Sequence, residues 1–406
     1  MSNSRKWFTC TPVRFAGGQA FFARDSGLLC KGFQEIGVEC KAIMPGPPME
    51  GDQVEDLIRT DYDNLENADW WRSLEGEGVV FYGWGLGKYV RIVRSIKQAG
   101  LVLISHMDTD GILGILNGIP EYAGRLWRVT LGERGKSVGS LLHFATRLGY
   151  AATVGLIRND WMCAQHLKQA DVIGAVSPLA LERLRKVCSI SGGENLADRV
   201  RIVPHPTASF MMPDSRFPKE RLVVAVGRWD DDRVKGTELL MATAKMLLTM
   251  NSDVRIEIYG YAPLVISTWL QNLPDPIRDR IMLAGVVRNT VVSQALQRAQ
   301  VVICTSLRES YHAVSAEALC CGCSIVGPDV PEIPSMKWFT DGPFGRMAER
   351  TPTALTQAVL AELADWGAGL RVPSSIAFHW GNILHAPQIA RRIISMFDSR
   401  GVNIEV

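Results

Sequence analysis

Two glutamates with seven residues between them, Glu309 and Glu317, have the spacing and setting in this chain that most directly suggest chemistry. The segment opens with the apolar run Val301 to Cys304 and continues into a helical pattern, which predicts a strand–loop–helix unit. Because the chain contains 20 glutamates, this spacing is expected about once by chance and proves little alone. Glu309 falls in the loop and Glu317 about two turns later, so the pair cannot share one proton as an acid–base dyad. Two carboxylates placed in this way would hold opposite ends of an extended ligand.

Two basic residues lie in an earlier strand–loop–helix segment. The apolar strand Leu222 to Val226 leads into Gly227 and Arg228, and Lys235 precedes a helical pattern that starts near Glu238. A diphosphate leaving group gains negative charge as its bond to a sugar breaks, and cations or helix N-termini stabilise that charge. Arg228 and Lys235 could supply the cations. The alternative is that both are solvated surface charges.

The order of these segments is informative. Two more strands follow, Val254 to Tyr259 ending at Gly260, and one ending at Gly285-Val286. This series of strand ends, each followed by glycine or a charge and then a helix, resembles the donor-binding half of retaining GT-B glycosyltransferases, the glycosyltransferase family 4 (group 1) type. The resemblance covers residues 6–400 and is strongest between 222 and 345. It implies an α/β chain with two Rossmann-like domains, whose parallel sheets face a central cleft.

The resemblance implies a role for each of these residues. Arg228 and Lys235, beside Gly227, would contact the donor diphosphate. Glu309 would contact the hexose hydroxyls and Glu317 the ribose hydroxyls, since a carboxylate accepts from two vicinal hydroxyls at once. Glu309, Arg228 and Lys235 are therefore expected in the catalytic machinery of a hexosyltransferase-type enzyme that uses a nucleoside-diphosphate sugar and retains the anomeric configuration.

The start of the second helix belongs to the same expected donor site. The resemblance implies that the backbone amides of Tyr311, His312 and Ala313 face the sugar and phosphate. A Gly-aromatic-Gly triplet is common here in the family, whereas this chain reads Ser310-Tyr311-His312, and the larger side chains would narrow the sugar pocket. No side chain stands out as a nucleophile, so the resemblance implies front-face substitution in which the leaving phosphate takes the acceptor proton.

Gly17 and Gly18 are the matching feature of the first half. They follow the predicted strand Lys6 to Thr11 and precede the predicted helix Ala20 to Ile36. Glycine lets a backbone approach a phosphate closely, and the helix adds its N-terminal dipole. By the resemblance both glycines are expected to bind the donor; the alternative is an ordinary turn.

A histidine of the first domain often faces the transferred sugar in the family, within a Thr-x-His stretch. The corresponding place here reads Thr130-Leu131-Gly132, so that histidine is missing. His106, after the predicted strand Leu101 to Ser105, is the substitute candidate. A lone histidine at a strand end can equally be structural.

Asp108-Thr109-Asp110 is a competing constellation. GT-A glycosyltransferases hold a divalent ion on the diphosphate with such an Asp-x-Asp, using oxygen ligands suited to Mg or Mn. The alternative is an acidic turn in which an aspartate caps backbone amides near Gly111. A GT-A chain would not also need the later series with Arg228 and Lys235, so the turn is favoured. No cofactor is expected, and no metal requirement.

The chain length of 406 residues predicts two domains. The prolines of Val203-Pro204-His205-Pro206 mark a stiff boundary. The prediction is an acceptor-side domain over 1–205 and a donor-binding domain over 206–375, with a C-terminal helix in 376–406 packing back on the first. The Pro45 to Gly78 stretch is hard to place and could be an acceptor-side insertion.

Composition narrows the partners. The net charge of +2 gives no general argument for nucleic acid. Nine cysteines without zinc spacing, and no apolar signal core in Met1 to Thr11, predict a cytoplasmic protein. Basic clusters at Arg91–Lys97 and Arg125–Lys136 are either solvated faces or contacts to an anionic acceptor or the inner membrane surface. The acceptor is a glycan, a lipid or a small molecule, which would place the protein in glycan biosynthesis.

Two other classes share the fold. A GT-B relative could be a nucleotide-sugar epimerase, or a phosphorylase, although no signature for a pyridoxal cofactor is evident. The chain could also be a non-catalytic binding or assembly protein. The presence of Arg228, Lys235, Glu309 and Glu317 argues against that reading, and the missing histidine argues for it.

Overall fold

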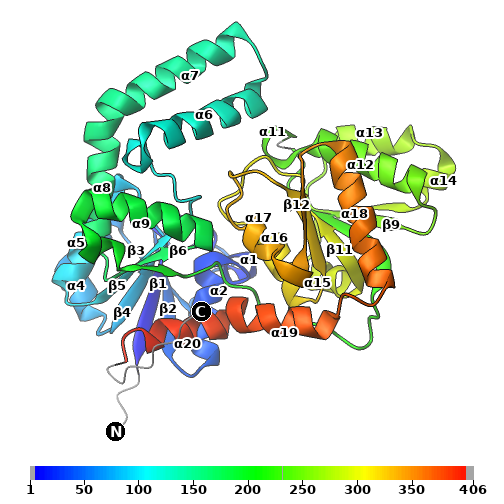
Figure 1. The fold of residues 1–406 in the computed structure, drawn as a ribbon. Coiled ribbons are helices and arrows are strands. Elements are labelled where there is room, and N and C mark those ends of the chain that lie inside the picture. The colour runs from blue at the N-terminus through cyan, green and yellow to red at the C-terminus, as the bar shows by residue number, and fades with distance from the viewer. Residues whose placement is uncertain (1–4, 231, 399–406) are drawn as a thin grey trace. The chain divides into compact units, whose positions relative to one another are not determined.

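A computed structural model describes residues 5–230 and 232–398 (Figure 1). Strands and helices alternate along the chain, as the sequence predicts. The strands are β1 Lys6–Cys10, β2 Glu39–Pro45, β3 Leu57–Thr60, β4 Gly78–Phe81, β5 Val102–Met107, β6 Val172–Ala175, β7 Val200–Ile202, β8 Glu220–Val226, β9 Arg255–Tyr259, β10 Ile281–Gly285, β11 Ala299–Ile303, β12 Ser324–Pro328 and β13 Gly345–Ala348.

The helices differ widely in length. They are α1 Gln19–Phe22, α2 Asp25–Glu35, α3 Tyr62–Leu65, α4 Ala68–Ser73, α5 Val90–Gln98, α6 Ile119–Arg134, α7 Val138–Tyr150, α8 Trp161–Gln169, α9 Pro178–Gly192, α10 Glu194–Ala197, α11 Asp232–Lys235, α12 Thr237–Met250, α13 Leu264–Gln271, α14 Asp275–Arg278, α15 Asn289–Arg298, α16 Ala313–Cys320, α17 Met336–Phe339, α18 Pro352–Gly367, α19 Pro373–Leu384 and α20 Ala386–Ser395. A π-helix, Ala151–Asp160, joins α7 to α8.

The first sheet has seven strands in the order β3-β2-β1-β4-β5-β6-β7, and every pairing between them is parallel. Because both faces are covered by helices, successive residues of β1 enter different cores. Trp7 packs with Phe33 of α2 and Ile389 of α20, whereas Phe8 packs with Trp71 of α4. The chain leaves β1 toward β2 and β3 and returns to the other side at β4, so the strand order reverses between β1 and β4.

The second sheet has six strands in the order β10-β9-β8-β11-β12-β13, again with parallel pairing throughout. Val301 of β11 lies opposite Val223 of β8, so the loops after these two strands leave the same edge of the sheet. The strand order reverses here between β8 and β11. Ligands of open α/β sheets bind at such reversal points, outside the carboxyl ends of the strands.

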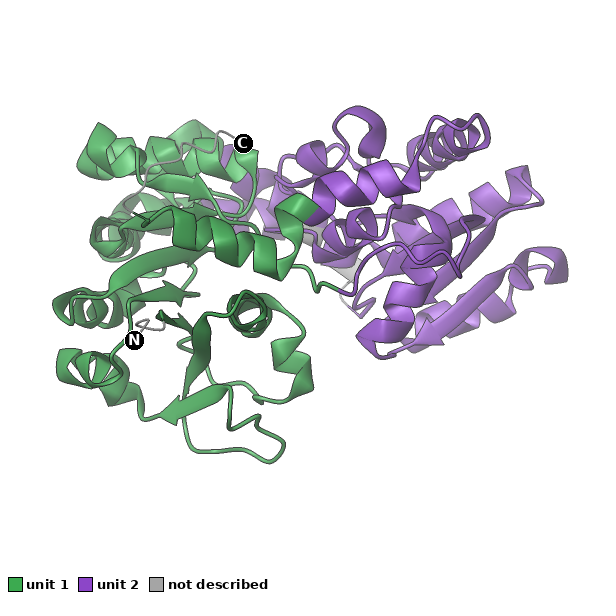
Figure 2. Cartoon of the chain, turned by 90° about the horizontal axis from the view of Figure 1, so that it is seen from below, with its two compact units in different colours: residues 1–122, 148–209, 382–406 green, residues 123–147, 210–381 purple. Residues whose placement is uncertain are grey.

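The chain forms two compact units (Figure 2). Over the described residues, unit 1 contains 5–122, 148–209 and 382–398, and unit 2 contains 123–147, 210–230 and 232–381. This division falls after Ser209 and again after Gly381, whereas the predicted domains were divided at 205 and at 376. Residues 123–147, most of α6 and α7, were expected in the first domain but belong to unit 2.

The last helix packs on the first unit through a close contact between backbones. Gly32 of α2 lies so near Ala386 of α20 that an added Cβ would stand 2.5 Å from the Ala386 carbonyl. Ile389, Ala390 and Ile393 of α20 continue this contact into the core around Trp7. A glycine at position 32 therefore allows α20 to complete the core of unit 1.

Candidate active site

The candidate site of unit 2 centres on an ion pair between Lys235 and Glu309. The Nζ of Lys235 donates to Oε1 of Glu309, and Ser306 Oγ donates to the same oxygen over 2.9 Å. Lys235 ends α11 in the connection after β8, and Glu309 lies in the loop after β11. Both strand ends meet at the reversal point of the sheet, so the fold brings together two residues that are 74 positions apart.

The backbone around Lys235 is held by the neighbouring loop. Thr305 Oγ1 donates to the Lys235 carbonyl over 2.8 Å, and the Leu307 amide donates to the Val234 carbonyl over 2.7 Å. Gly236 has φ of +70° and lies against Thr305, where an added Cβ would stand 2.4 Å from the carbonyl oxygen. Only glycine adopts this conformation without strain and also fits the space. The lysine is thus fixed relative to the loop that carries Glu309.

The N-terminus of α16 is capped by its own residues. His312 Nδ1 lies 2.7 Å from Ser315 Oγ and accepts from the Ser315 amide, and burial lowers the pKa of this histidine to about 4, so its ring is neutral. The His312 amide donates to Ser335 Oγ over 3.2 Å, and the Ala313 amide donates to the Tyr311 carbonyl over 3.1 Å. The amides of His312 and Ala313, which were expected to face the donor, therefore have partners within the chain.

The other residues of unit 2 that were predicted to bind the donor come from the same two connections as this pair and from α16. Ser310 and Glu317 are half-buried, the first in the Glu309 loop and the second on α16. Tyr311 is buried and packs edge-on against Phe339 with ring centroids 5.3 Å apart. Arg228 is exposed, and the amide of Gly227 donates to Tyr259 of the adjacent strand β9. The direct contact that defines this site is the ion pair between Lys235 and Glu309.

Gly17 and Gly18 precede α1 in unit 1. The Gly17 amide donates to Oδ1 of Asp52 over 2.8 Å, and an added Cβ would meet Leu57 at 2.2 Å. Asp52 also accepts hydrogen bonds from the Arg59 guanidinium, and these bonds lower the pKa of the Asp52 carboxyl. In this structure Gly17 therefore packs against β3 and binds a carboxylate, and the donor contact expected of both glycines stays a prediction.

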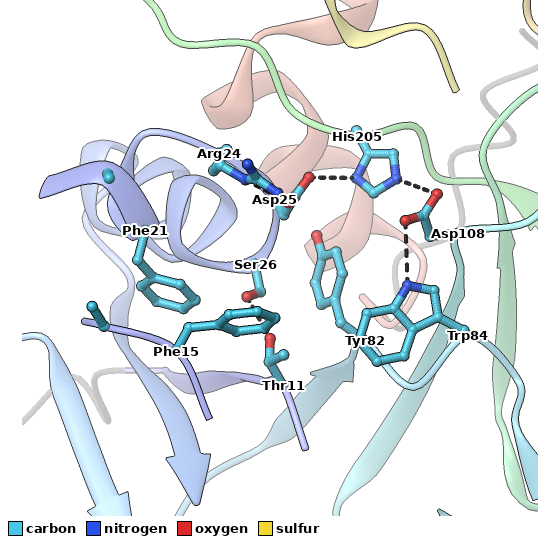
Figure 3. A pocket seen from close by; sticks show the side chains of 12 residues that line it. Thr11, Phe15, Phe21, Arg24, Asp25, Ser26, Tyr82, Trp84, Asp108 and His205 are labelled. Carbon is cyan, nitrogen blue, oxygen red and sulfur yellow. Dashed lines mark hydrogen bonds and ion pairs between the residues drawn. The ribbon is translucent and has the colours of Figure 1, made fainter. Parts of the chain in front are cut away.

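His106 lies on β5 and is completely buried. Its ring stacks on Tyr82 with centroids 4.3 Å apart and lies 4.7 Å from the ring of His205. Burial and the positive charge of His205 lower the pKa of His106 to about 3, so this ring is neutral. The lining of a pocket in this unit includes Tyr82 and His205 but not His106. Figure 3 shows Tyr82 and His205 in this pocket.

His205 was predicted only to lie at the domain boundary. Its ring nitrogens form ion pairs with Asp25 at 3.2 Å and Asp108 at 3.0 Å. Burial alone would lower the pKa of His205, but the charge and hydrogen bond of Asp108 and the hydrogen bond of Asp25 outweigh burial and raise it to about 10. The imidazole is therefore a cation at neutral pH. Its flanking prolines had suggested only a domain boundary.

Asp108 and Asp110 do not face a common point in the contacts that they make. Asp108 pairs with His205, while Asp110 Oδ1 accepts from the Ile112 amide over 3.1 Å in a local turn. The helix expected at Gly111 is absent, because residues 108–114 form a loop, so the aspartate caps a turn there and not a helix. Within residues 5–230 and 232–398, no three His, Cys, Asp or Glu side chains gather in a way that could hold a metal ion.

The basic clusters have partners inside the chain. Lys97 pairs with Asp171 at 2.6 Å, and Arg128 pairs with the buried Glu332 at 2.7 Å. These pairs favour a structural role for the two residues. No helix in the described part of the chain is long and apolar enough to cross a membrane.

Comparison with known proteins bears on both units. Residues 220–365 match the family model described as glycosyl transferases group 1, a stretch that contains Lys235 and Glu309. The phosphatidylinositol N-acetylglucosaminyltransferase gpi3 subunit of Schizosaccharomyces pombe is 28% identical over 141 residues, which are 34% of this chain and 30% of that protein. The chain thus spans less than a third of the curated relative that it matches.

Solved structures extend the likeness to the whole chain. The lipopolysaccharide outer core galactosyltransferase WaaB in its apo form superposes with a TM-score of 0.60 at 12% identity, covering 98% of this chain and 100% of that one. Alr3699/HepE of Anabaena, solved in complex with UDP, gives 0.60 at 13% identity, with 97% and 100% covered. The chain has the GT-B fold. This confirms the predicted fold class, and GT-B architecture together with the family match supports a glycosyltransferase.

Proposed function

We propose that the protein transfers a sugar from a nucleoside-diphosphate donor, bound in unit 2, to an acceptor hydroxyl with retention of anomeric configuration. The observation that carries the proposal is the pair of Lys235 and Glu309 at the reversal point of the second sheet, inside the stretch that matches the glycosyltransferase family model. A cation and a carboxylate side by side suit the junction of a diphosphate and a sugar.

The two side chains would bind different parts of the donor. The Lys235 ammonium, 22% exposed, would lie against the diphosphate and stabilise the charge that grows on it as the glycosidic bond breaks. Glu309, 17% exposed, would accept hydrogen bonds from the sugar hydroxyls and fix the orientation of the ring. Arg228 would add a second cation from the loop after β8, and Glu317 would hold the ribose. The acceptor proton would leave with the phosphate.

Donor binding is tested first, by isothermal titration of UDP against wild type and Lys235→Ala. UDP is the first probe because Alr3699/HepE is solved with it. One charge-assisted contact to phosphate corresponds to an affinity loss of about 10- to 100-fold on removal. Lys245→Ala, an exposed lysine on α12, is the matched control and should bind UDP as wild type does. Equal affinity in both variants would remove Lys235 from the site.

Glu309→Gln separates the two roles. Because Glu309 would hold the sugar and pairs with Lys235 in the free protein, its neutralisation should leave UDP affinity unchanged or raise it, and should lower the release of UDP from UDP-N-acetylglucosamine or UDP-glucose. Glu349→Gln, exposed in the same unit, is the control. A loss of UDP affinity equal to that of Lys235→Ala would contradict the division. Retention is tested by the anomeric proton coupling of the product in NMR spectra.

The finer expectations about partners extend this proposal. The acceptor would be a glycan, a lipid or a small molecule, and the protein would work in the cytoplasm, with peripheral contact at the inner membrane surface where the acceptor is a lipid. Co-sedimentation with anionic phospholipid vesicles tests that contact. Recovery of the protein in the supernatant at low salt would contradict it.

A further inference from the structure

The pocket in unit 1 lies at the reversal point of the first sheet. It has a volume of about 390 Å³, within the range of roughly 300–1,000 Å³ common for small-molecule sites. Thr11 follows β1, Tyr82 follows β4 and Asp108 follows β5, so the carboxyl ends of three neighbouring strands contribute to its lining. This is the place where an open parallel sheet offers a ligand site.

Tyr82 carries the strongest sign of a missing ligand. Its side chain is almost fully buried, at 4% exposure, yet its hydroxyl has no hydrogen-bond partner among the described residues. In Figure 3 this hydroxyl points toward Asp25 and His205, which also line the pocket. Burial and the charges of Asp25 and Asp108 keep the pKa of the phenol well above its usual value, so the hydroxyl keeps its proton. A buried hydroxyl without a partner is costly, and a ligand oxygen would remove the cost.

The backbone of the same pocket is strained. Asp25 and Trp84 both line it, and their φ angles are positive, 49° and 52°. Residues other than glycine rarely adopt such angles. Such strain persists where surrounding contacts hold it, and it clusters at ligand sites. The two residues are held through the ion pairs around His205, because Asp25 pairs with His205 directly and Trp84 Nε1 donates to Asp108 over 3.3 Å.

The charges of the lining indicate the kind of ligand. His205 is balanced by Asp25 and Asp108, and the Arg24 guanidinium donates to Asp25 over 3.1 Å. Two cations thus face two carboxylates, which gives no excess positive charge for a phosphate. Beside these groups the pocket offers the hydroxyls of Thr11 and Ser26 and the aromatic faces of Phe15, Phe21 and Trp84. One side of the lining thus has hydroxyl and carboxylate oxygens, and the other has flat aromatic side chains. Such a lining suits a ligand ring that is polar at its edge and apolar on its face.

We propose that this pocket binds a neutral sugar ring, whose hydroxyls meet Tyr82 and the carboxylates of Asp25 and Asp108 while its face lies on the aromatic wall. The inference rests on the proposed function only in assigning that ring to the acceptor. The site itself is built from unit 1 and needs no donor.

Saturation-transfer difference NMR tests the proposal with D-glucose, D-galactose, D-mannose and N-acetylglucosamine as probes, and with inorganic phosphate as a competitor. At least one neutral sugar should receive saturation, and phosphate should not displace it. Tyr82→Phe removes only the hydroxyl and keeps the ring that stacks on His106, and it should weaken sugar binding by roughly five- to tenfold. Tyr62→Phe, at a tyrosine 39% exposed outside the pocket, should bind the sugar as wild type does.

Three results would overturn the proposal: no saturation of any of the four sugars, equal binding by Tyr82→Phe and wild type, or displacement by phosphate. Folding of Tyr82→Phe is monitored by its thermal midpoint, which should equal or exceed that of wild type because the lost hydroxyl has no partner. UDP titration of the same variant separates the two proposals. A protein that binds UDP and no sugar refutes the pocket alone, and one that binds sugar without UDP refutes the proposed donor site alone.

Discussion

Replacing His205 by glutamine should change how the stability of the protein depends on pH. In the folded chain the pKa of His205 is raised to about 10 from an ordinary value of 6.5. A raised pKa means that the native state binds a proton more tightly than the unfolded state. The resulting stabilisation is therefore fully present below about pH 6.5 and is lost as the pH rises through about 10. Glutamine cannot be protonated, so the variant lacks this term.

The size of the effect follows from the shift. A difference of about 3.5 units, at 1.36 kcal/mol for each unit, sets a ceiling of about 5 kcal/mol in acid, of which about 4 kcal/mol should disappear between pH 6 and pH 9.5. Asp25 and Asp108 contact the His205 ring, and their charges are included in the shift, while the neutral rings of Tyr82 and His106 lie 6.3 and 4.7 Å from it. The difference between wild type and variant should thus fall by about 1.2 kcal/mol on average for each pH unit from pH 7 to 9.5.

Urea unfolding of wild type and His205→Gln at pH 6, 7, 8 and 9.5 measures this difference, since titrations common to both proteins cancel. His143→Gln, at a partly exposed position on α7, is the matched control for replacing an imidazole by an amide. The ring of His205 can also be followed directly by its nitrogen chemical shifts in wild type. A pH-independent difference, or a ring that is neutral at pH 8, would refute the argument that two carboxylates hold this imidazole as a cation.

Three further substitutions test the packing and the donor site. Gly32→Ala should lower the free energy of unfolding by about 1–3 kcal/mol because its Cβ would strike the α20 backbone, whereas Gly149→Ala, which meets nothing within 4 Å, should be neutral or stabilising by urea unfolding. Arg371→Met removes one partner of the fully buried Glu362 and should lower the unfolding free energy in the same assay by about 3 kcal/mol. Gly236→Ala combines a positive φ with a clash and should weaken UDP binding by calorimetry at least about tenfold, the result of displacing the neighbouring lysine.

The predicted strands agree with the structure because buried parallel strands read as short apolar runs. The strands expected at Lys6–Thr11 and Leu222–Val226 are present within two residues. The helix expected over Ala20–Ile36 is instead two helices, interrupted where Asp25 takes its positive φ. The stretch between Pro45 and Gly78, which had no clear pattern, contains β3, α3 and α4. Short elements with few apolar positions give too little periodicity to be recognised.

The candidate sites of the two units differ in how much of them a sequence can show. Lys235 and Glu309 lie in the connections that follow two apolar strands, so the pattern of strand ends in the sequence points to both, and the parallel pairing of β8 with β11 brings these connections together. His205 lies just after a three-residue strand, between Pro204 and Pro206, and its partners come from the start of α2 (Asp25) and the end of β5 (Asp108). Strand order determines which ends meet, but the rotation of each side chain decides which residue faces the pocket. Thus β5 brings His106 to the edge of the sheet, where its ring stacks on Tyr82 without lining the pocket, while His205 does line it. A histidine in the expected place can therefore lie outside the pocket, while another, from a segment that reads as a domain boundary, lines it.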